Sequence, residues 1–233
     1  DQVGYVFYID AASLDLAYRK TTDGGKNWSN ASVVIDTVVA GWTTVSVWYD
    51  QWTPGDTTGT KIHIVASDDG TDDIYYTFLD TAADTLKGSV VAAILGATVS
   101  ESIDGSPSIT KGAGGALFIY GNFTTTAGGG VAKSTDGAGA VWTTITPGSW
   151  SSVALDQMQL VPLLTDNDVM LIWVDTAGNT IYSRVYDEVT DTWDVGWTNI
   201  GTLVENTTYD QWFSASTKKS TGNVYLTFAN NIN

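Results

Sequence analysis

Residues Tyr5–Asp10 read YVFYID, a run of apolar and aromatic residues that ends in aspartate, and this pattern returns four times along the chain. The other copies are HIVASD (His63–Asp68), LFIYGN (Leu117–Asn122), MLIWVD (Met170–Asp175) and YLTFAN (Tyr225–Asn230). Their last residues lie 58, 54, 53 and 55 positions apart. Continuous apolar runs of this length are typical of strands buried on both faces, and a terminal Asp or Asn can open a turn. The repeat predicts similar β units of about 55 residues.

Two further features share this period. A second strand follows each of the first four copies and ends near Asp23, Asp80, Asp136 and Asp187. A third strand is expected to begin near Asp50, Asp104, Asp156 and Asp210, 18 to 20 residues before the closing Asp or Asn. A period of roughly 40 to 55 residues that carries four short strands is the signature of propeller blades.

The predicted fold is therefore an all-β propeller of about five four-stranded blades. Residues 1–233 form one domain or propeller segment, because no linker or change of composition divides the chain. The chain is expected to begin and end in mid-blade, and its simplest explanation is an internal piece of a longer propeller chain. A swapped or assembled ring is the alternative.

Composition excludes several classes of protein. The chain has 26 acidic and 10 basic residues, a net charge of −16, and no cysteine. Because nucleic acids and anionic membranes are bound by clustered Lys and Arg, neither is an expected partner. No apolar run approaches the roughly 18 residues of a membrane span. The single histidine, His63, rules out a multi-histidine metal site and is expected to stand on a strand rather than in a catalytic triad.

One short motif points to a known family. Thr21, Asp23, Gly25 and Trp28 match every specified position of the Asp-box, Ser/Thr-x-Asp-x-Gly-x-x-Trp. Degenerate copies follow, and their residues are Ser134, Asp136 and Trp142, then Asp187 and Trp193. The chain thus resembles the sialidase-type Asp-box (BNR repeat) β-propellers over essentially its whole length. In that family the boxes are peripheral and structural: the carboxylate binds backbone N–H groups and the Trp packs between sheets.

The same resemblance argues against sialidase activity. Sialidases of this family bind the substrate carboxylate with three arginines, whereas this chain has only Arg19 and Arg184. Both arginines are expected in the second strand of their repeats, away from the central axis of the propeller. The chain is therefore expected to be non-catalytic.

A glycoside hydrolase remains the alternative, because two carboxylates about 5 to 10 Å apart can cleave a glycoside. Acids expected between consecutive repeats are Glu101, Asp104 and Glu205, and Glu205 beside Tyr209 could form a Glu-assisted Tyr nucleophile. No catalytic residue is assigned beyond this alternative.

Aromatic and acidic residues between repeats are also what sugar-binding sites use. The segment Tyr49-Asp50-Gln51-Trp52 recurs as Tyr209-Asp210-Gln211-Trp212. The candidate ligand-binding residues are Asp50, Trp52, Asp210, Trp212, Trp42 and Trp150. Packing of these Trp side chains between blades is the alternative.

No cofactor is expected, although calcium is possible. Clustered hard oxygens are offered by Asp68, Asp69, Asp72 and Asp73, and by Asp166 and Asp168. Neither group matches an EF-hand loop. The predicted function is a non-catalytic recognition and structural module that contacts carbohydrate or a surface partner protein, at an extracellular, cell-surface or virion location. A pure scaffold subunit of a larger surface assembly is the third reading.

Overall fold

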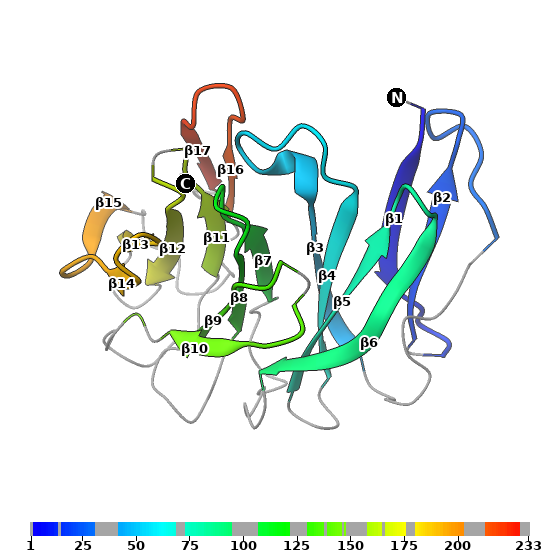
Figure 1. Cartoon of the computed structure of the whole chain (residues 1–233), viewed down its shortest axis with the longest axis horizontal. Coiled ribbons are helices and arrows are strands. Elements are labelled where there is room, and N and C mark those ends of the chain that lie inside the picture. Colours follow the sequence, from blue (N-terminus) through cyan, green and yellow to red (C-terminus); the bar gives the residue numbers. More distant parts are fainter. Residues whose placement is uncertain are drawn as a thin grey trace, which may run out of the picture.

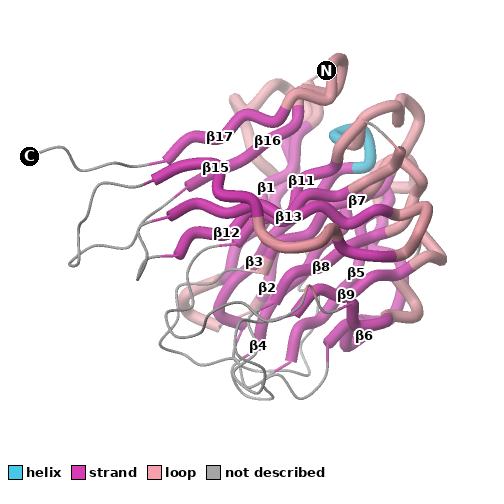
Figure 2. The backbone as a smooth tube through the Cα atoms, turned by 90° about the vertical axis from the view of Figure 1, so that its left-hand side faces the viewer, coloured by secondary structure: helices cyan, strands magenta, loops and turns pink. Residues whose placement is uncertain are grey.

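The structure is a computed structural model, and the residues that it describes are mostly β-strand with almost no helix. It describes residues 2–13, 15–30, 42–68, 73–94, 107–121, 130–137, 139–145, 147, 158–164, 166–175, 180–202 and 213–228. Figure 2 shows that strands dominate these residues, with one short helix among them. Within the described part of the chain, no helix is long and apolar enough to cross a membrane.

In the described part of the chain, the strands form five antiparallel sheets in sequence order. The first sheet contains β1 (Gly4–Ile9) and β2 (Leu16–Thr21). The second contains β3 (Trp42–Tyr49), β4 (Lys61–Asp68), β5 (Asp73–Asp80) and β6 (Thr85–Ile94). The third contains β7 (Ser108–Lys111), β8 (Leu117–Gly121), β9 (Gly130–Ser134) and β10 (Thr143–Ile145). The fourth contains β11 (Met158–Pro162), β12 (Val169–Asp175), β13 (Thr180–Asp187), β14 (Thr192–Trp193) and β15 (Thr198–Thr202), and the fifth contains β16 (Phe213–Thr217) and β17 (Val224–Phe228).

Each of the five repeated runs is a strand in this structure, namely β1, β4, β8, β12 and β17. The second and third sheets pair four strands in chain order, as the repeat predicts. Consecutive sheets stand beside one another, because β1 contacts β3, β3 contacts β7, β7 contacts β11 and β11 contacts β16. Figure 1 shows this succession, with the β3–β4 link and the β16–β17 turn at its upper edge.

Hydrophobic clusters fill the spaces between consecutive sheets. Between the second and third sheets, Tyr76 of β5 packs with Leu117 and Ile119 of β8. Between the third and fourth, Phe118 and Tyr120, on the opposite face of β8, meet the residues of β11 and β12. Similar clusters join the first sheet to the second and the fourth to the fifth. A fully buried large side chain contributes about 1.5–3 kcal/mol, so these joints are the main source of stability.

One predicted boundary is wrong. The third strand of the second repeat was expected to begin near Asp50, but β3 begins at Trp42 and ends at Tyr49. The reason is register, because β3 pairs with β4 from Trp42 opposite Asp68 to Tyr49 opposite Ile62. Residues 50–60 therefore link β3 to β4, and this link is longer than the corresponding links at residues 112–116 and 163–168.

Candidate functional site

The link between β3 and β4 is a compact loop, and we call residues Asp50–Thr60 the Asp50 loop. It starts with a short 3-10 helix, η1 (Asp50–Trp52). The Asp56 carboxylate then accepts the backbone N–H groups of Thr58, at 3.0 Å, and Gly59, at 2.7 Å. A Cβ atom on Gly59 would lie 2.3 Å from Cβ of Asp50, so only glycine fits where the loop folds back on its first residue.

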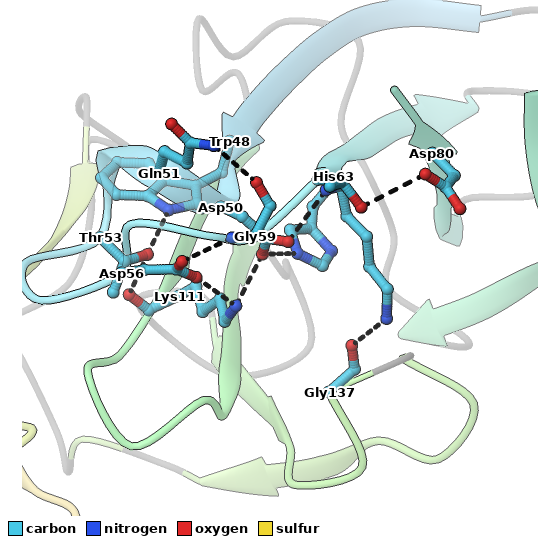
Figure 3. A network of polar contacts seen from close by, with 12 residues as sticks. Trp48, Asp50, Gln51, Thr53, Asp56, Gly59, His63, Asp80, Lys111 and Gly137 are labelled. Carbon is cyan, nitrogen blue, oxygen red and sulfur yellow. Dashed lines mark hydrogen bonds and ion pairs between the residues drawn. The ribbon is translucent and has the colours of Figure 1, made fainter. Parts of the chain in front are cut away.

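Asp50 is the centre of the polar network beneath this loop (Figure 3), and only 3% of the residue is exposed. Its Oδ2 accepts the backbone N–H of Lys61 at 2.9 Å. Its Oδ1 accepts Lys111 Nζ at 2.7 Å and lies 2.9 Å from His63 Nε2. Burial alone would raise the pKa of Asp50, but the hydrogen bonds from His63 and Lys111 outweigh burial and hold the pKa well below its ordinary value.

His63 lies in β4 with no exposed surface. Its Nδ1 lies 2.7 Å from the Tyr76 hydroxyl, and the two rings stack with centroids 5.9 Å apart. Because the ionised Asp50 can only accept, Nε2 carries the hydrogen and Nδ1 accepts from Tyr76. Burial lowers the pKa of His63, although the Asp50 carboxylate opposes this shift. The neutral ring therefore has both nitrogens hydrogen-bonded.

Three lysines tie this region together across sheets. Lys111, at the end of β7, bridges Asp50 and Asp56, the second contact being 3.0 Å. Lys219, in the turn between β16 and β17, donates to the Gln51 carbonyl at 2.8 Å and also to the Asp56 carbonyl. Lys61 of β4 donates at 3.1 Å to the carbonyl of Gly137, in the third sheet. The Asp50 loop is thus held by the second, third and fifth sheets.

An aromatic group, which we call the Trp52 surface, lies where β3 meets the Asp50 loop: Trp48 and Tyr49 of β3, and Trp52 of the loop. Trp52 is 51% exposed. Its ring meets Trp48 at 5.7 Å and Tyr49 at 6.3 Å, both nearly perpendicular. Trp48 is fixed in turn, because its Nε1 donates to Thr53 Oγ1 at 3.0 Å. The exposed indole therefore sits on a well-supported base.

The candidate ligand-binding residues fall in different environments. Trp52 is exposed, but Trp42 is only 2% exposed and clusters with Leu16 and Tyr18 of β2, so it belongs to the joint between the first and second sheets. Asp50 is buried and engaged by protein groups. Both Asp50 and Trp52 lie between the first two strands of one sheet, not between two repeats. The remaining candidates, ligand-binding or catalytic, lie outside the described residues; they are Trp150, Asp210, Trp212, Glu101, Asp104, Glu205 and Tyr209.

Asp23 and Asp136 each organise a turn. The Asp23 carboxylate accepts Thr21 Oγ1 at 2.8 Å and the backbone N–H of Asn27 at 2.9 Å. Hydrogen bonds from the backbone and side chain of Asn27 lower the pKa of Asp23 to about 2. Asp136 accepts Ser134 Oγ, and backbone N–H groups as far on as Val141 at 3.2 Å.

Asp187 differs from these two. It ends β13 and accepts the near backbone N–H groups of Val189, at 2.8 Å, and Thr190, at 3.0 Å. This is an ordinary Asx turn. The contacts of Asp187 therefore differ from those of Asp23 and Asp136, with which the sequence aligns it.

The tryptophans that follow these turns differ in packing and exposure. Trp142 packs against Tyr76 of the preceding sheet with centroids 5.3 Å apart, and Trp193 packs against Tyr186 at 5.2 Å. Trp28 is 43% exposed. Gly25, in the turn before Trp28, has a φ of +88°.

Neither arginine resembles a substrate clamp. Arg19 of β2 donates to the Tyr8 hydroxyl at 3.3 Å on the exposed side of the first sheet. Arg184 of β13 donates to the carbonyls of Pro147 and Asp194 and lies 5.7 Å from the Trp197 ring centre. Both are engaged by protein groups, and they come from different sheets.

Two of the possible calcium ligands, Asp68 and Asp73, lie opposite one another where β4 pairs with β5. Asp68 is fully buried at the end of β4, and Asp73 begins β5, where it accepts the Tyr75 hydroxyl at 3.3 Å. Burial raises the pKa of Asp168, with nearby Asp187 and Asp166 adding to the shift. Asp69 and Asp72 lie outside the described residues. In the described ranges, no three His, Asp or Glu side chains come together as a metal site would need.

Sequence reasoning missed the partners of His63. The available signal was a polar residue at the start of an otherwise apolar strand, because a buried polar side chain needs hydrogen-bond partners. The identity of those partners required the fold, since Asp50 and Tyr76 are each 13 residues away in sequence (63 − 50 and 76 − 63).

Comparisons with known proteins identify the fold but not a family. No family model and no curated protein matches the chain. Among solved structures, the Hadza microbial sialidase Hz136 has a TM-score of 0.50 and 15% identity, over 90% of this chain and 41% of that chain. An exo-β-1,3-galactanase from Phanerochaete chrysosporium has a TM-score of 0.49 and 13% identity, over 98% of this chain and 57% of that chain. An α-L-arabinofuranosidase from Clostridium thermocellum has a TM-score of 0.44 and 14% identity, over 91% and 78%.

The likeness to the sialidase, a β-propeller glycosidase, supports an all-β, propeller-type fold. The chain spans less than two thirds of the sialidase and of the galactanase. At identities of 15% or less the likeness concerns the fold alone.

Proposed function

We propose that this chain is a non-catalytic propeller module that contacts carbohydrate, at an extracellular, cell-surface or virion location. The Trp52 surface carries the proposal. An exposed indole can stack on the apolar face of a sugar, and Trp52 stands on a loop fixed by Asp50, Lys111 and Lys219. Because the loop is already ordered by protein contacts, little ordering cost remains when a sugar binds.

The proposed role of each residue follows from its exposure. Trp52 supplies the stacking face. Asp56, with 17% of its side chain exposed, is the nearest candidate to accept a sugar hydroxyl, while it keeps its bonds to Lys111 and Gly59. Asp50 does not touch the ligand and positions the loop. With a net charge of −16, the chain should prefer neutral sugars to anionic ones.

The lack of a third arginine supports a non-catalytic role. The family that the chain resembles uses three arginines around one substrate carboxylate, and Arg19 and Arg184 belong to different sheets. Sialic acid recognition of that kind would need groups that this sequence does not contain.

A glycan array, followed by calorimetry on the strongest hit, tests the proposal. Trp52→Ala should weaken binding at least about tenfold, the loss expected for one stacked ring. Trp28→Ala is the matched control, since Trp28 is similarly exposed but belongs to the first sheet. Wild-type protein that binds no glycan, or a Trp52→Ala variant that binds equally well, would refute the proposal and leave the scaffold reading.

The likeness to a sialidase favours one alternative, a glycoside hydrolase. It would depend on Glu101, Asp104, Glu205 and Tyr209. Turnover of aryl glycosides by the wild type, abolished in Glu205→Gln or Asp104→Asn, would establish the enzyme and overturn the binding-only function.

A further inference from the structure

His63 is the only histidine in the chain and is completely buried. Its two ring nitrogens connect the Asp50 loop with Tyr76 of β5 in the second sheet. On one side Asp50 begins the Asp50 loop, and on the other Tyr76 packs against the third sheet. From this geometry we propose that His63 is a pH-sensitive switch, which keeps the Asp50 loop and the joint between the second and third sheets closed at neutral pH and releases both in acid.

The closed state requires a neutral ring. Nε2–H donates to Asp50 and Nδ1 accepts from Tyr76, so both nitrogens and the hydroxyl hydrogen are satisfied. A proton added at Nδ1 would turn this acceptor into a second donor. The hydroxyl hydrogen of Tyr76 would then need a new acceptor in a place where only 2% of Tyr76 is exposed.

Tyr76 cannot adjust by a small movement. A Cβ on Gly139 would lie 2.1 Å from Cε1 of its ring, which shows how closely the turn of the third sheet covers it. Trp142 packs edge-on against the same ring. A Tyr76 side chain that turned away from a protonated His63 would therefore separate the second sheet from the third.

The surrounding charges do not cancel this effect. Asp50 favours the protonated ring, whereas Lys111 and Lys61 disfavour it. Asp56 is bound to Lys111, and Asp136 lies on the Tyr76 side, where its charge and that of Asp50 add to the burial that raises the pKa of Tyr76. The largest effect on His63 is burial, which favours the neutral ring.

The pH window follows from the direction of the shift. An unfolded histidine titrates near pH 6.5, and the buried ring titrates at lower pH. Opening that exposes His63 therefore becomes easier as the pH falls below about 6.5, by up to about tenfold per pH unit for one proton. Because the pKa of Asp50 is also lowered from 3.8, protonation of Asp50 adds to the effect only at about pH 4 and below.

Two readouts of the intact chain test this switch. Because there is one histidine, its imidazole NMR signals report His63 without assignment and should show the Nε2–H form at pH 7, with no titration near 6.5. The backbone N–H of Lys61 donates directly to Asp50, so its hydrogen exchange reports opening of the loop. After correction for intrinsic rates, the opening constant should rise from pH 6.5 to 4.5, while in His63→Gln it should stay level.

The control amide is Leu163, whose N–H bonds the Asp168 carbonyl in the fourth sheet, away from His63. Its opening should keep the same pH dependence in wild type and in His63→Gln. If His63→Gln does not fold, the wild type alone decides, because Lys61 opening must increase as the pH falls below about 6.5 while the His63 signals of the folded protein keep the neutral form until lower pH. A His63 signal that titrates near 6.5 while Lys61 stays protected, or an equal acid response in His63→Gln, would overturn the switch.

Discussion

The rings of Tyr76 and Trp142 meet edge to face across two sheets, with their centroids 5.3 Å apart. Tyr76 belongs to β5, and Trp142 follows the turn that Asp136 organises. Trp142 Nε1 donates to the Gly139 carbonyl at 2.8 Å, so the indole and the turn form one unit. The joint between the second and third sheets therefore depends on how closely this turn approaches Tyr76.

The first prediction concerns that approach. Gly139→Ala should destabilise the protein by about 3 kcal/mol, because the new Cβ would lie 2.1 Å from the Tyr76 ring, at a φ of +68°. Gly137→Ala is the matched control. Its φ is +61°, but its nearest neighbour would be 3.7 Å away, so only about 1 kcal/mol of backbone strain is expected. Urea unfolding of both variants measures the difference, and equal losses would contradict the proposed tight contact.

A second prediction separates two aspartates that look alike in sequence. Asp136→Ala should cost about 2–3 kcal/mol, because the N–H groups of Gly139, Ala140 and Val141 lose their acceptor. Asp187→Ala should cost less, since Asp187 accepts two exposed N–H groups, whereas Asp136 accepts three and one of them, the N–H of Gly139, is part-buried. Thermal unfolding of the pair checks this order. Equal losses would show that both turns carry the same weight, and a larger loss for Asp187→Ala would reverse the predicted order.

The strands could be predicted from the sequence because the residue pattern that marks them is local. A run such as Met170–Asp175 is apolar at nearly every position and ends in a turn former, so its length and boundaries can be recognised without the fold. The repeated spacing of these runs then predicts how strands follow one another.

The candidate site could not be predicted from the sequence in the same way. Tyr49–Trp52 and Tyr209–Trp212 share the letters YDQW, yet the first follows β3 and the second precedes β16. Counting a constant distance back from Asp68 cannot reveal that the link at residues 50–60 is long, because strand register decides where β3 ends. The exposed Trp52 was identified by its residue type, whereas the buried status of Asp50 depends on partners such as Lys111.

The third prediction concerns the tie between the fifth sheet and the Asp50 loop. Lys219→Ala should loosen the loop and cost about 1–2 kcal/mol, because the Gln51 and Asp56 carbonyls lose a charged donor. Lys218→Ala changes the same charge at the adjacent position and is the control. Hydrogen exchange of the Thr58 and Gly59 amides should rise in the first variant only. Equal protection in both variants would mean that the loop is held without Lys219.

The last prediction has the opposite dependence on pH from the His63 switch. Glu188 follows β13, and Cβ atoms on Gly112 and Gly114 would lie 2.9 and 3.0 Å from its carboxylate oxygens. Its Oε2 is buried and, within the described part of the chain, has no hydrogen-bond partner. Burial raises the pKa of Glu188; nearby Lys133 opposes the shift, and Asp168 adds to it. The folded protein thus holds the proton to higher pH than the unfolded chain does.

Stability contributed by this group is present below the unfolded pKa of 4.5 and is lost as pH rises through the folded value. Glu188→Gln keeps the shape and removes the charge, so its melting temperature should exceed that of the wild type by a margin that grows from pH 4.5 upward and then levels off. Asp187→Asn is the adjacent control; its pKa is lowered by the N–H groups of Thr190 and Val189, so it should gain nothing. Melting curves from pH 4.5 to 8.5 decide the matter. Parallel curves for Glu188→Gln and the wild type would mean that Glu188 is ionised and solvated in the folded protein.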